Sequence, residues 1–279
     1  MNLTVLLDNN TIIDRYFLGE PAVSYLIEDN GTRILFDVGY SDAFLQNAYR
    51  MKIDLLDLDH IVLSHGHLDH TWGLDSIVRL FTEAKIEGLV HSEPTVVGHP
   101  LVFNSKTYAG LNEIGSIIGA EKLSRIFKLE LSRVPLWLTK SIVFLGEIPR
   151  IFDFELESLE SKVIIHGKEE EEDKLSDDTA IAIKTENGLV IITGCSHSGI
   201  CNIIEYAKSV CNENRVVDVI GGFHLLQPPE AKISRTVDYF NKLNVREVHA
   251  CHCTDLMSKI ALSKVCNLKE VGSGLRLEY

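Results

Sequence analysis

Three histidines and an aspartate fall within six residues of the chain, in the segment SHGHLDH at positions 64–70. The segment directly follows the apolar run at 60–63, which predicts a buried strand that ends in a tight turn. Gly66 lacks the β-carbon that would crowd such a turn. Imidazole and carboxylate are preferred ligands of zinc, iron and manganese, so the first two histidines can bind one ion and the other pair a second. A polar surface cluster is the ordinary alternative. The four candidate ligands are His65, His67, Asp69 and His70.

Strand and helix patterns alternate along most of the chain. Two Asn-Gly turns, at 30–31 and 187–188, each separate two apolar runs and so predict two β-hairpins. Each hairpin is followed by alternating helices and strands, which predicts two packed sheets with helices outside. The further predicted elements are helices at 41–52, 74–83, 199–210, 230–243 and 256–265, and strands at 86–91, 141–148, 216–223, 245–251 and 275–279.

Two stretches depart from this alternation. Glycines and a proline interrupt residues 95–140, which predicts an inserted cap or small subdomain that covers the site. The acidic run at 169–173 predicts a solvated loop. His99 and His166 stand in loop-like sequence, and we expect both to be solvated.

Composition narrows the class of protein. The 279 residues include 40 acidic and 27 basic side chains, a formal charge of −13, which disfavours nucleic acid and anionic membrane as partners. We find neither an apolar run of about 18–20 residues nor a signal-peptide pattern at the start. Six cysteines in such a chain are expected to be thiols. A cytoplasmic protein follows as the expectation, with its oligomeric state open.

The histidine segment, together with the upstream LFDVG at 35–39, resembles the metallo-β-lactamase superfamily. The hallmark of that superfamily is His-x-His-x-Asp-His after a strand, and the resemblance extends over nearly the whole chain. It implies an α/β fold, a four-layer αββα sandwich with metals between the sheet edges. The expected organisation is a single domain over residues 1–279 with the cap-like insertion at about 95–140.

A series of further motifs is similar to the dihydropteroate-synthase-like branch of the superfamily. The named activity of that branch is 7,8-dihydropterin-6-ylmethyl-4-(β-D-ribofuranosyl)aminobenzene 5′-phosphate synthase, and other members are called metal-dependent hydrolases. Kinship of fold does not by itself fix the reaction. The motifs are GEIPR at 146–150, DDTA at 177–180, TGCSH at 193–197, GGFH at 221–224 and HCT at 252–254.

The resemblance also implies two bound divalent metal ions, with zinc expected first and iron or manganese as alternatives. His252 matches the closing histidine of the superfamily. Cys195 stands where most members have a bridging aspartate; it either binds metal as a thiolate or packs as a small apolar side chain. His197, two residues further on, is the other expected ligand.

Three more polar residues are candidates for chemistry. His224 ends an apolar strand and is expected to face the substrate as acid, base or late metal ligand, or to be an ordinary half-buried histidine. Asp178 is expected to orient a ligand histidine or to cap a turn. Arg150, fixed beside a proline, either binds a substrate phosphate or is solvated. We take Asp69, His224 and Asp178 as the expected catalytic residues.

These residues predict a metal-dependent enzyme that acts on a phosphorylated small molecule. In one scheme a metal-activated water hydrolyses the substrate, as in a phosphoesterase. In the other, a pterin pyrophosphate loses its pyrophosphate as an aromatic carbon attacks the pterin methylene. A di-iron redox or ligand-binding protein on the same fold is the alternative from another class.

Overall fold

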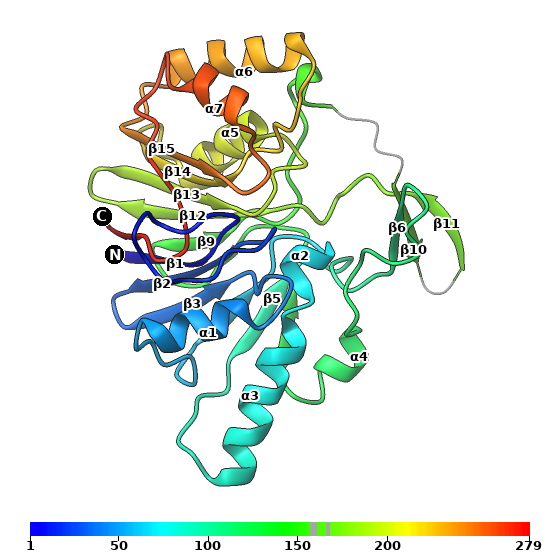
Figure 1. The fold of residues 1–279 in the computed structure, drawn as a ribbon. Helices are drawn as coiled ribbons and strands as arrows, with labels where there is room; N and C mark the ends of the chain where they lie inside the picture. Colours follow the sequence, from blue (N-terminus) through cyan, green and yellow to red (C-terminus); the bar gives the residue numbers. More distant parts are fainter. Residues whose placement is uncertain (157–160, 166–167) are drawn as a thin grey trace. The chain divides into compact units, whose positions relative to one another are not determined.

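The computed structural model describes residues 1–156, 161–165 and 168–279, and the chain divides into two units. Unit 1 contains Met1–Ser132, Gly272–Tyr279 and the described part of Leu159–Asp177. Unit 2 contains Asp178–Val271 and the described part of Arg133–Ser158. Each unit has its own large sheet and its own helices (Figure 1).

Unit 1 is built on a seven-stranded sheet in the order β16-β1-β2-β3-β4-β5-β7. The predicted hairpin forms its centre, because Asn30 and Gly31 both take positive φ angles (49° and 84°), as a tight two-residue turn requires. The strands are β1 Asn2–Leu7, β2 Ser24–Asp29, β3 Thr32–Phe36, β4 His60–Val62, β5 Thr95–Gly98, β7 Lys128–Leu131 and β16 Arg276–Glu278.

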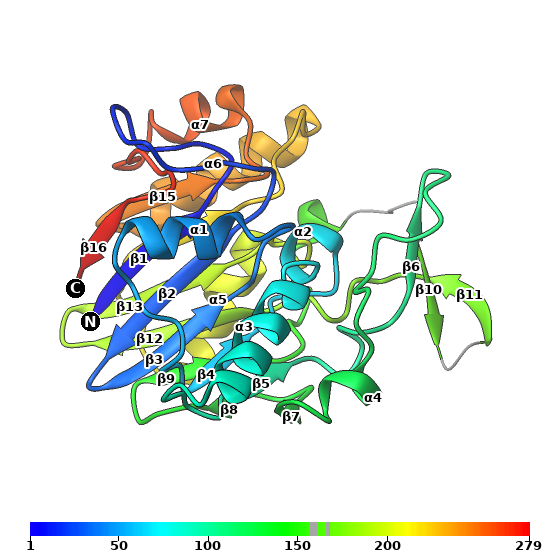
Figure 2. The same cartoon turned by 60° about the horizontal axis from the view of Figure 1, so that its bottom comes forward.

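Two amphipathic helices of unit 1 pack on one face of this sheet (Figure 2). They are α1, Ala43–Arg50, and α3, Leu74–Glu87. Phe44 of α1 and Phe81 of α3 join the same buried apolar cluster as Leu26 of β2. The short helices α2, Leu68–Thr71, and α4, Ala120–Leu123, complete the helices described in unit 1.

The direction of the strands determines where the polar loops of unit 1 lie. β3, β4 and β5 are parallel neighbours, so their carboxyl ends share one edge of the sheet. The turns that begin at Asp37 and Ser64 therefore start side by side, although 27 positions separate these residues in the sequence. This placement brings the histidine segment to the sheet edge.

A second, three-stranded sheet of unit 1 has the order β11-β10-β6, with strands β6 Lys106–Tyr108, β10 Ser161–Ile165 and β11 Lys168–Glu172. The prediction of a solvated loop at 169–173 is therefore wrong: most of the run pairs as β11, and Asp173 is buried against a lysine. Within 95–140, where we predicted an inserted cap, β5 and β7 belong to the large sheet and β6 to the small one.

Unit 2 has a six-stranded sheet in the order β15-β14-β13-β12-β9-β8. The predicted hairpin at Asn187-Gly188 joins β12 and β13, and β13, β14 and β15 run parallel. The strands are β8 Leu136–Trp137, β9 Ile142–Phe144, β12 Ala180–Thr185, β13 Gly188–Thr193, β14 Val216–Gly222 and β15 Glu247–Cys251.

Three helices of unit 2 pack on one face of its sheet. Ile203 of α5, Phe240 of α6 and Leu262 of α7 belong to one buried cluster with Val219 of β14 and Val248 of β15. The helices are α5 Ile200–Cys211, α6 Glu230–Leu243 and α7 Leu256–Leu262, and a short 3-10 turn covers Asp153–Glu155.

One predicted strand is wrong. The apolar residues at 86–91 suggested a strand, but α3 continues to Glu87 and ends at Gly88 in the left-handed conformation that favours glycine at a helix end. The side chains of Ile86 and Val90 are 75% and 95% exposed, so their apolar character does not reflect a buried strand. The next strand of the sheet begins at Thr95.

Candidate metal centre

Of the four predicted ligands of unit 1, His65 and His67 lie on the turn that follows β4, and Asp69 and His70 lie on the short helix α2. His65 and His70 are fully buried, whereas His67 and Asp69 are partly exposed. The His65 ring lies 4.6 Å from the His67 ring and 4.2 Å from the His70 ring, measured between centroids. His70 Nε2 is 3.4 Å from an Asp69 carboxylate oxygen. Three imidazoles and a carboxylate thus form one group.

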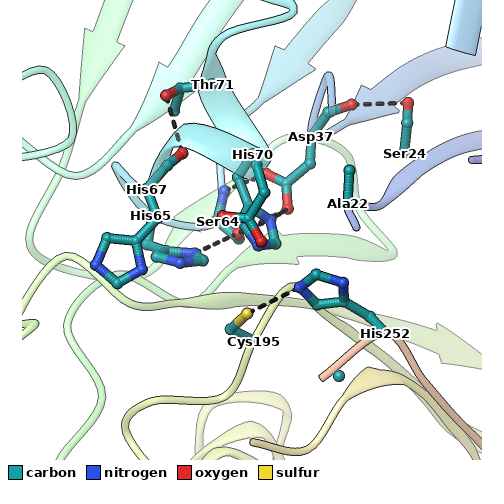
Figure 3. A network of polar contacts seen from close by, with 12 residues as sticks. Ala22, Ser24, Asp37, Ser64, His65, His67, His70, Thr71, Cys195 and His252 are labelled. Atoms are coloured by element: carbon teal, nitrogen blue, oxygen red, sulfur yellow. Dashed lines mark hydrogen bonds and ion pairs between the residues drawn. The ribbon is translucent and has the colours of Figure 1, made fainter. Parts of the chain in front are cut away.

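The buried carboxylate of Asp37 orients this group (Figure 3). Ser64 donates to Asp37 through its backbone N–H and its hydroxyl, both at 2.7 Å, and His70 Nδ1 lies 2.7 Å from Asp37 Oδ2. A carboxylate at Nδ1 directs Nε2 of the same ring toward a metal. Asp37 has a φ of 56°, a conformation that is sparsely populated outside glycine and is typical of functional positions.

Burial and neighbouring charges set the protonation of these rings. Burial lowers the pKa of His67 to about 3, and the Lys106 charge acts in the same direction, so this ring is neutral at neutral pH as a metal ligand must be. Burial alone would lower the pKa of His70, but the carboxylates of Asp69 and Asp37 hold it well above its ordinary value. The negative charge around His70 equally favours a divalent cation.

Candidate ligands of unit 2 follow the carboxyl ends of three adjacent parallel strands. Cys195 comes after β13, His224 after β14 and His252 after β15. His224 and His252 have φ angles of 49° and 51°, and Ser196, beside Cys195, has 58°. Because parallel strands end at one edge, the fold brings together residues up to 57 positions apart.

The side chains of this second group are in mutual reach. His252 Nε2 lies 3.1 Å from Cys195 Sγ (Figure 3). Cys195, His197 and His224 each offer one ligand atom, and these atoms lie within 4.8 Å of one another. The His197 and His224 ring centroids are 4.3 Å apart. A thiolate with imidazoles is a donor set that zinc and iron accept.

A second cysteine lies beside this group. Cys253 Sγ contacts the Cys195 carbonyl oxygen at 3.5 Å and accepts from the His224 backbone N–H at 3.3 Å. Burial alone would raise the pKa of Cys253, but Cys195 and the His252 and His224 rings hold it well below its ordinary value. All six cysteines are free thiols, as we expected from the sequence.

The other predicted site residues have well-defined backbone surroundings. Asp178 accepts a hydrogen bond from the Ser198 backbone N–H at 2.8 Å and so holds the loop that carries His197. Arg150 is half-buried, and the two residues after it donate their N–H groups to Asn202 Oδ1 at 2.9 and 3.0 Å. These bonds hold the segment that follows Arg150 against the first turn of helix α5.

The structure corrects one prediction and adds two residues. His99 is fully buried, not solvated, and its Nδ1 accepts from the Leu101 N–H at 3.2 Å in a tight turn; His166 lies outside the described residues. We assigned no role to Asp37 from the sequence, although its position in an Asp-x-Gly motif directly after a strand indicated a site residue. We assigned none to Lys106 either, for which the sequence holds no comparable signal.

The described helices of the protein are short or amphipathic. Within the described part of the chain, no helix is both long and apolar enough to cross a bilayer. The candidate donors are imidazoles with a carboxylate in unit 1 and imidazoles with a thiol in unit 2, and both sets suit divalent transition metals. A mixed α/β fold with such donors after its strands is typical of a class of metal-dependent enzymes.

Comparison with known proteins identifies the family. The profile of the metallo-beta-lactamase superfamily matches residues 18–210, so the chain belongs to this superfamily. A crystal structure of Tm1679, a metal-dependent hydrolase of the beta-lactamase superfamily, matches with a TM-score of 0.83 and 30% identity, over 100% of this chain and 99% of the other. The predicted metallo-β-lactamase-like α/β fold is confirmed.

Two curated relatives come from Methanocaldococcus jannaschii. One, an uncharacterised protein, is 34% identical over 268 residues, which are 95% of each chain. The other is 7,8-dihydropterin-6-methyl-4-(β-D-ribofuranosyl)-aminobenzene-5′-phosphate synthase, 34% identical over 260 residues, which cover 85% of this chain and 82% of the relative. The predicted resemblance to the synthase branch is therefore confirmed.

Proposed function

We propose that this protein is a metal-dependent enzyme that acts on a phosphorylated small molecule. The observation that carries the proposal is the buried turn of unit 1, on which three imidazoles and a carboxylate gather and His70 is oriented by Asp37 at 2.7 Å. A core gains nothing from so many polar rings in one place, whereas divalent ions require them. Membership of the superfamily supports the same reading.

We propose that the candidate ligands described above hold two divalent ions, as the family resemblance implies. Zinc is the expected metal, and iron or manganese suits the imidazole and carboxylate donors too. Cys195 replaces the usual bridging aspartate in this proposal, and His224, whose ring lies 4.3 Å from that of His197, is a further donor or a substrate contact. The proposed ligands are His65, His67, Asp69, His70, Cys195, His197 and His252.

When bound, such ions polarise a phosphoryl oxygen and lower the pKa of a nearby water. The chain's own residues supply orientation and proton handling. Asp37 fixes the His70 ring, and Asp178 holds the His197 loop through Ser198. We assign to Asp69 and His224 the exchange of protons with the substrate, and to Arg150 the binding of its phosphate.

One specific observation favours a second form of the reaction. The relative that covers 85% of this chain is named as a synthase of a dihydropterin compound that carries a ribofuranosylaminobenzene phosphate. In that form, the bond from the pterin methylene to the pyrophosphate oxygen breaks while the arylamine nitrogen, and not the aromatic carbon that we expected from the sequence, bonds to the methylene. Pyrophosphate leaves with the bonding electrons, and the nitrogen loses its proton to a base. Water must then be excluded from the site.

A turnover assay with the metal-loaded protein tests both forms. We expect pyrophosphate release from a dihydropterin-methyl pyrophosphate, or hydrolysis of bis-p-nitrophenyl phosphate. Release that requires a ribofuranosylaminobenzene phosphate identifies the synthase form; release in water alone identifies a hydrolase. The His65→Ala/His67→Ala double variant is the matched control, and activity equal to that of the wild type would contradict the proposal.

Metal analysis of the purified protein tests the alternative class. A di-iron redox or ligand-binding protein predicts two iron ions per chain, redox-dependent absorption and no turnover of either phosphorylated substrate. The enzyme proposal predicts turnover that is lost with a chelator and restored by a divalent ion. Iron content without any such turnover would favour the alternative.

A further inference from the structure

A buried lysine of the small sheet reaches the proposed metal-binding turn through one carboxylate. We propose that Lys106 and Asp177 are positioning residues that fix the turn between His65 and His67. The inference rests on the proposed metal centre and concerns unit 1 alone. In this proposal β6 pairs within the small sheet and also aligns two metal ligands that stand about 40 positions earlier in the sequence.

The contacts run in a short chain. Lys106 Nζ lies 2.7 Å from Asp177 Oδ1, and the other oxygen of the same carboxylate accepts from the Gly66 backbone N–H at 2.8 Å. Asp177 therefore faces the lysine with one oxygen and the metal-binding turn with the other. Since Gly66 stands between the two histidines, this hydrogen bond sets the orientation of the peptide that links them.

The neighbours of Gly66 leave no room for a side chain at this position. A β-carbon on Gly66 would meet the Val102 carbonyl oxygen at 2.5 Å, and Asp177 Oδ2 and the Lys106 side chain at 3.2 Å each. Glycine is thus required by the close approach of its neighbours and not by a left-handed backbone conformation. The same closeness allows the carboxylate to reach the peptide N–H directly.

Burial makes the arrangement specific. Lys106 is fully buried, and Asp177 and Asp173 are 1% and 7% exposed. Asp173 Oδ2 is 3.0 Å from Lys106 Nζ, so one cation sits between two carboxylates. A buried charge that loses its partner is costly, so the lysine and Asp177 hold each other in one geometry. Of these two carboxylates, only Asp177 also accepts a hydrogen bond from Gly66, since the other oxygen of Asp173 accepts from the Leu175 N–H.

A second bond ties the same segment to the far end of the metal-binding turn. The Trp72 indole N–H donates to the Gly115 carbonyl oxygen at 2.8 Å, and the backbone N–H groups of Gly115 and Lys106 both donate to Glu113 Oε1. Residues 106–115 thus reach Gly66 through Asp177 and contact Trp72 directly, so the ligand segment is bonded near both of its ends.

The test compares two isosteric substitutions in the same buried triad. Asp177→Asn leaves either Lys106 or the Gly66 N–H without its acceptor, whereas Asp173→Asn weakens the lysine pair equally but keeps the Gly66 bond. Zinc affinity is measured by chelator competition, Co²⁺ coordination by visible absorption, and metal-free stability by thermal unfolding. We expect Asp177→Asn to weaken zinc binding about 10- to 100-fold and alter the Co²⁺ spectrum, while Asp173→Asn changes stability alone.

A third variant covers the case in which Asp177→Asn does not fold. Gly66→Ala leaves every charge in place but pushes the turn away from Val102, and it should weaken zinc binding and alter the Co²⁺ spectrum in the same way. Equal losses for Asp177→Asn and Asp173→Asn, or wild-type zinc binding in Gly66→Ala, would overturn the positioning role. Wild-type protein that binds no divalent metal would instead overturn the proposed function itself.

Discussion

At the scale of single residues, the site depends on groups that hold ligands as much as on the ligands. Asp37 receives two bonds from Ser64 and faces His70 Nδ1, all at 2.7 Å. Asp37 has a left-handed φ, and Ser24 donates to its carbonyl oxygen at 2.8 Å. Such positions cost about 1–3 kcal/mol in backbone strain and persist where the surroundings over-determine them.

The first prediction concerns Asp37. In Asp37→Asn, one of the donors at Ser64 and His70 loses its acceptor, so the His70 ring is no longer fixed. We expect zinc affinity to fall about 10- to 100-fold, as for other partners of metal-bound histidines. Chelator competition measures the change, and Ser24→Ala, which touches only the Asp37 backbone, is the control. Equal affinities for the two variants would contradict the orienting role.

The second prediction concerns Cys195. Its sulfur lies 3.1 Å from His252 Nε2, so Cys195→Ala removes a donor at the centre of the unit 2 group. We expect a loss of at least about tenfold in metal affinity if the thiolate coordinates. Cys201→Ala is the matched control, because that buried thiol has a strongly raised pKa and stays protonated. Identical metal titrations for both variants would leave Cys195 a packing role only.

At the scale of elements, helix ends and strand ends cooperate in unit 2. Asp255 caps α7 by accepting from the Ser258 N–H at 2.7 Å, and it also accepts from the Gln227 N–H at 2.7 Å. Gln227 follows β14 and His224 by a few residues, and the Leu225 N–H donates to the Cys253 carbonyl oxygen. The cap therefore links α7 to the loops that carry two candidate ligands.

The third prediction concerns this cap. Burial alone would raise the pKa of Asp255, but the N–H groups of Ser258 and Gln227 hold it below its ordinary value. Asp255→Ala should lower the free energy of unfolding by about 0.5–2 kcal/mol at neutral pH. The stabilisation is fully present above the unfolded pKa of about 3.9 and is lost as the pH falls through the lower folded pKa.

Urea unfolding at a series of pH values measures this effect. Asp238→Ala, on the exposed side of α6, is the control and should change stability by less than about 0.5 kcal/mol. The difference between the wild type and Asp255→Ala should shrink on acidification. A difference that is constant down to about pH 2 would show that the carboxylate charge does not contribute.

At the scale of the whole molecule, the relevant features are an apolar core in each unit and the net negative charge. Unit 1 and unit 2 each have a buried apolar cluster that includes their sheet and helices. The formal charge of −13 favours cations over polyanions in the surroundings of the protein. A metal that binds only the folded chain also stabilises it, by an amount that grows with the logarithm of its excess over Kd.

The fourth prediction tests whether both units supply ligands. Zinc at 100-fold excess over its Kd should stabilise the wild type by about 2.7 kcal/mol, seen as a rise in Tm that a chelator reverses. His65→Ala in unit 1 and His252→Ala in unit 2 should each reduce this gain. His60→Ala, at the start of β4 and outside the ligand segment, is the control. A full gain in His252→Ala would contradict a ligand role for His252.

Features that depend on neighbouring residues in the chain could be predicted from the sequence of this protein. Asn-Gly turns identify the two hairpins because their conformational demands are local, and ligand types within six residues identify the metal-binding segment. The end of helix α3 could not be predicted in this way, since the apolar residues Ile86 and Val90 suggested a buried strand but are exposed. Tertiary structure alone decided that His99 is buried, that Asp37 meets His70, and that Asp177 reaches Gly66 across 111 positions. These contacts arise from strand order and close packing, which bring together residues that are far apart in the chain. The sequence around each residue therefore does not indicate which partner it will meet.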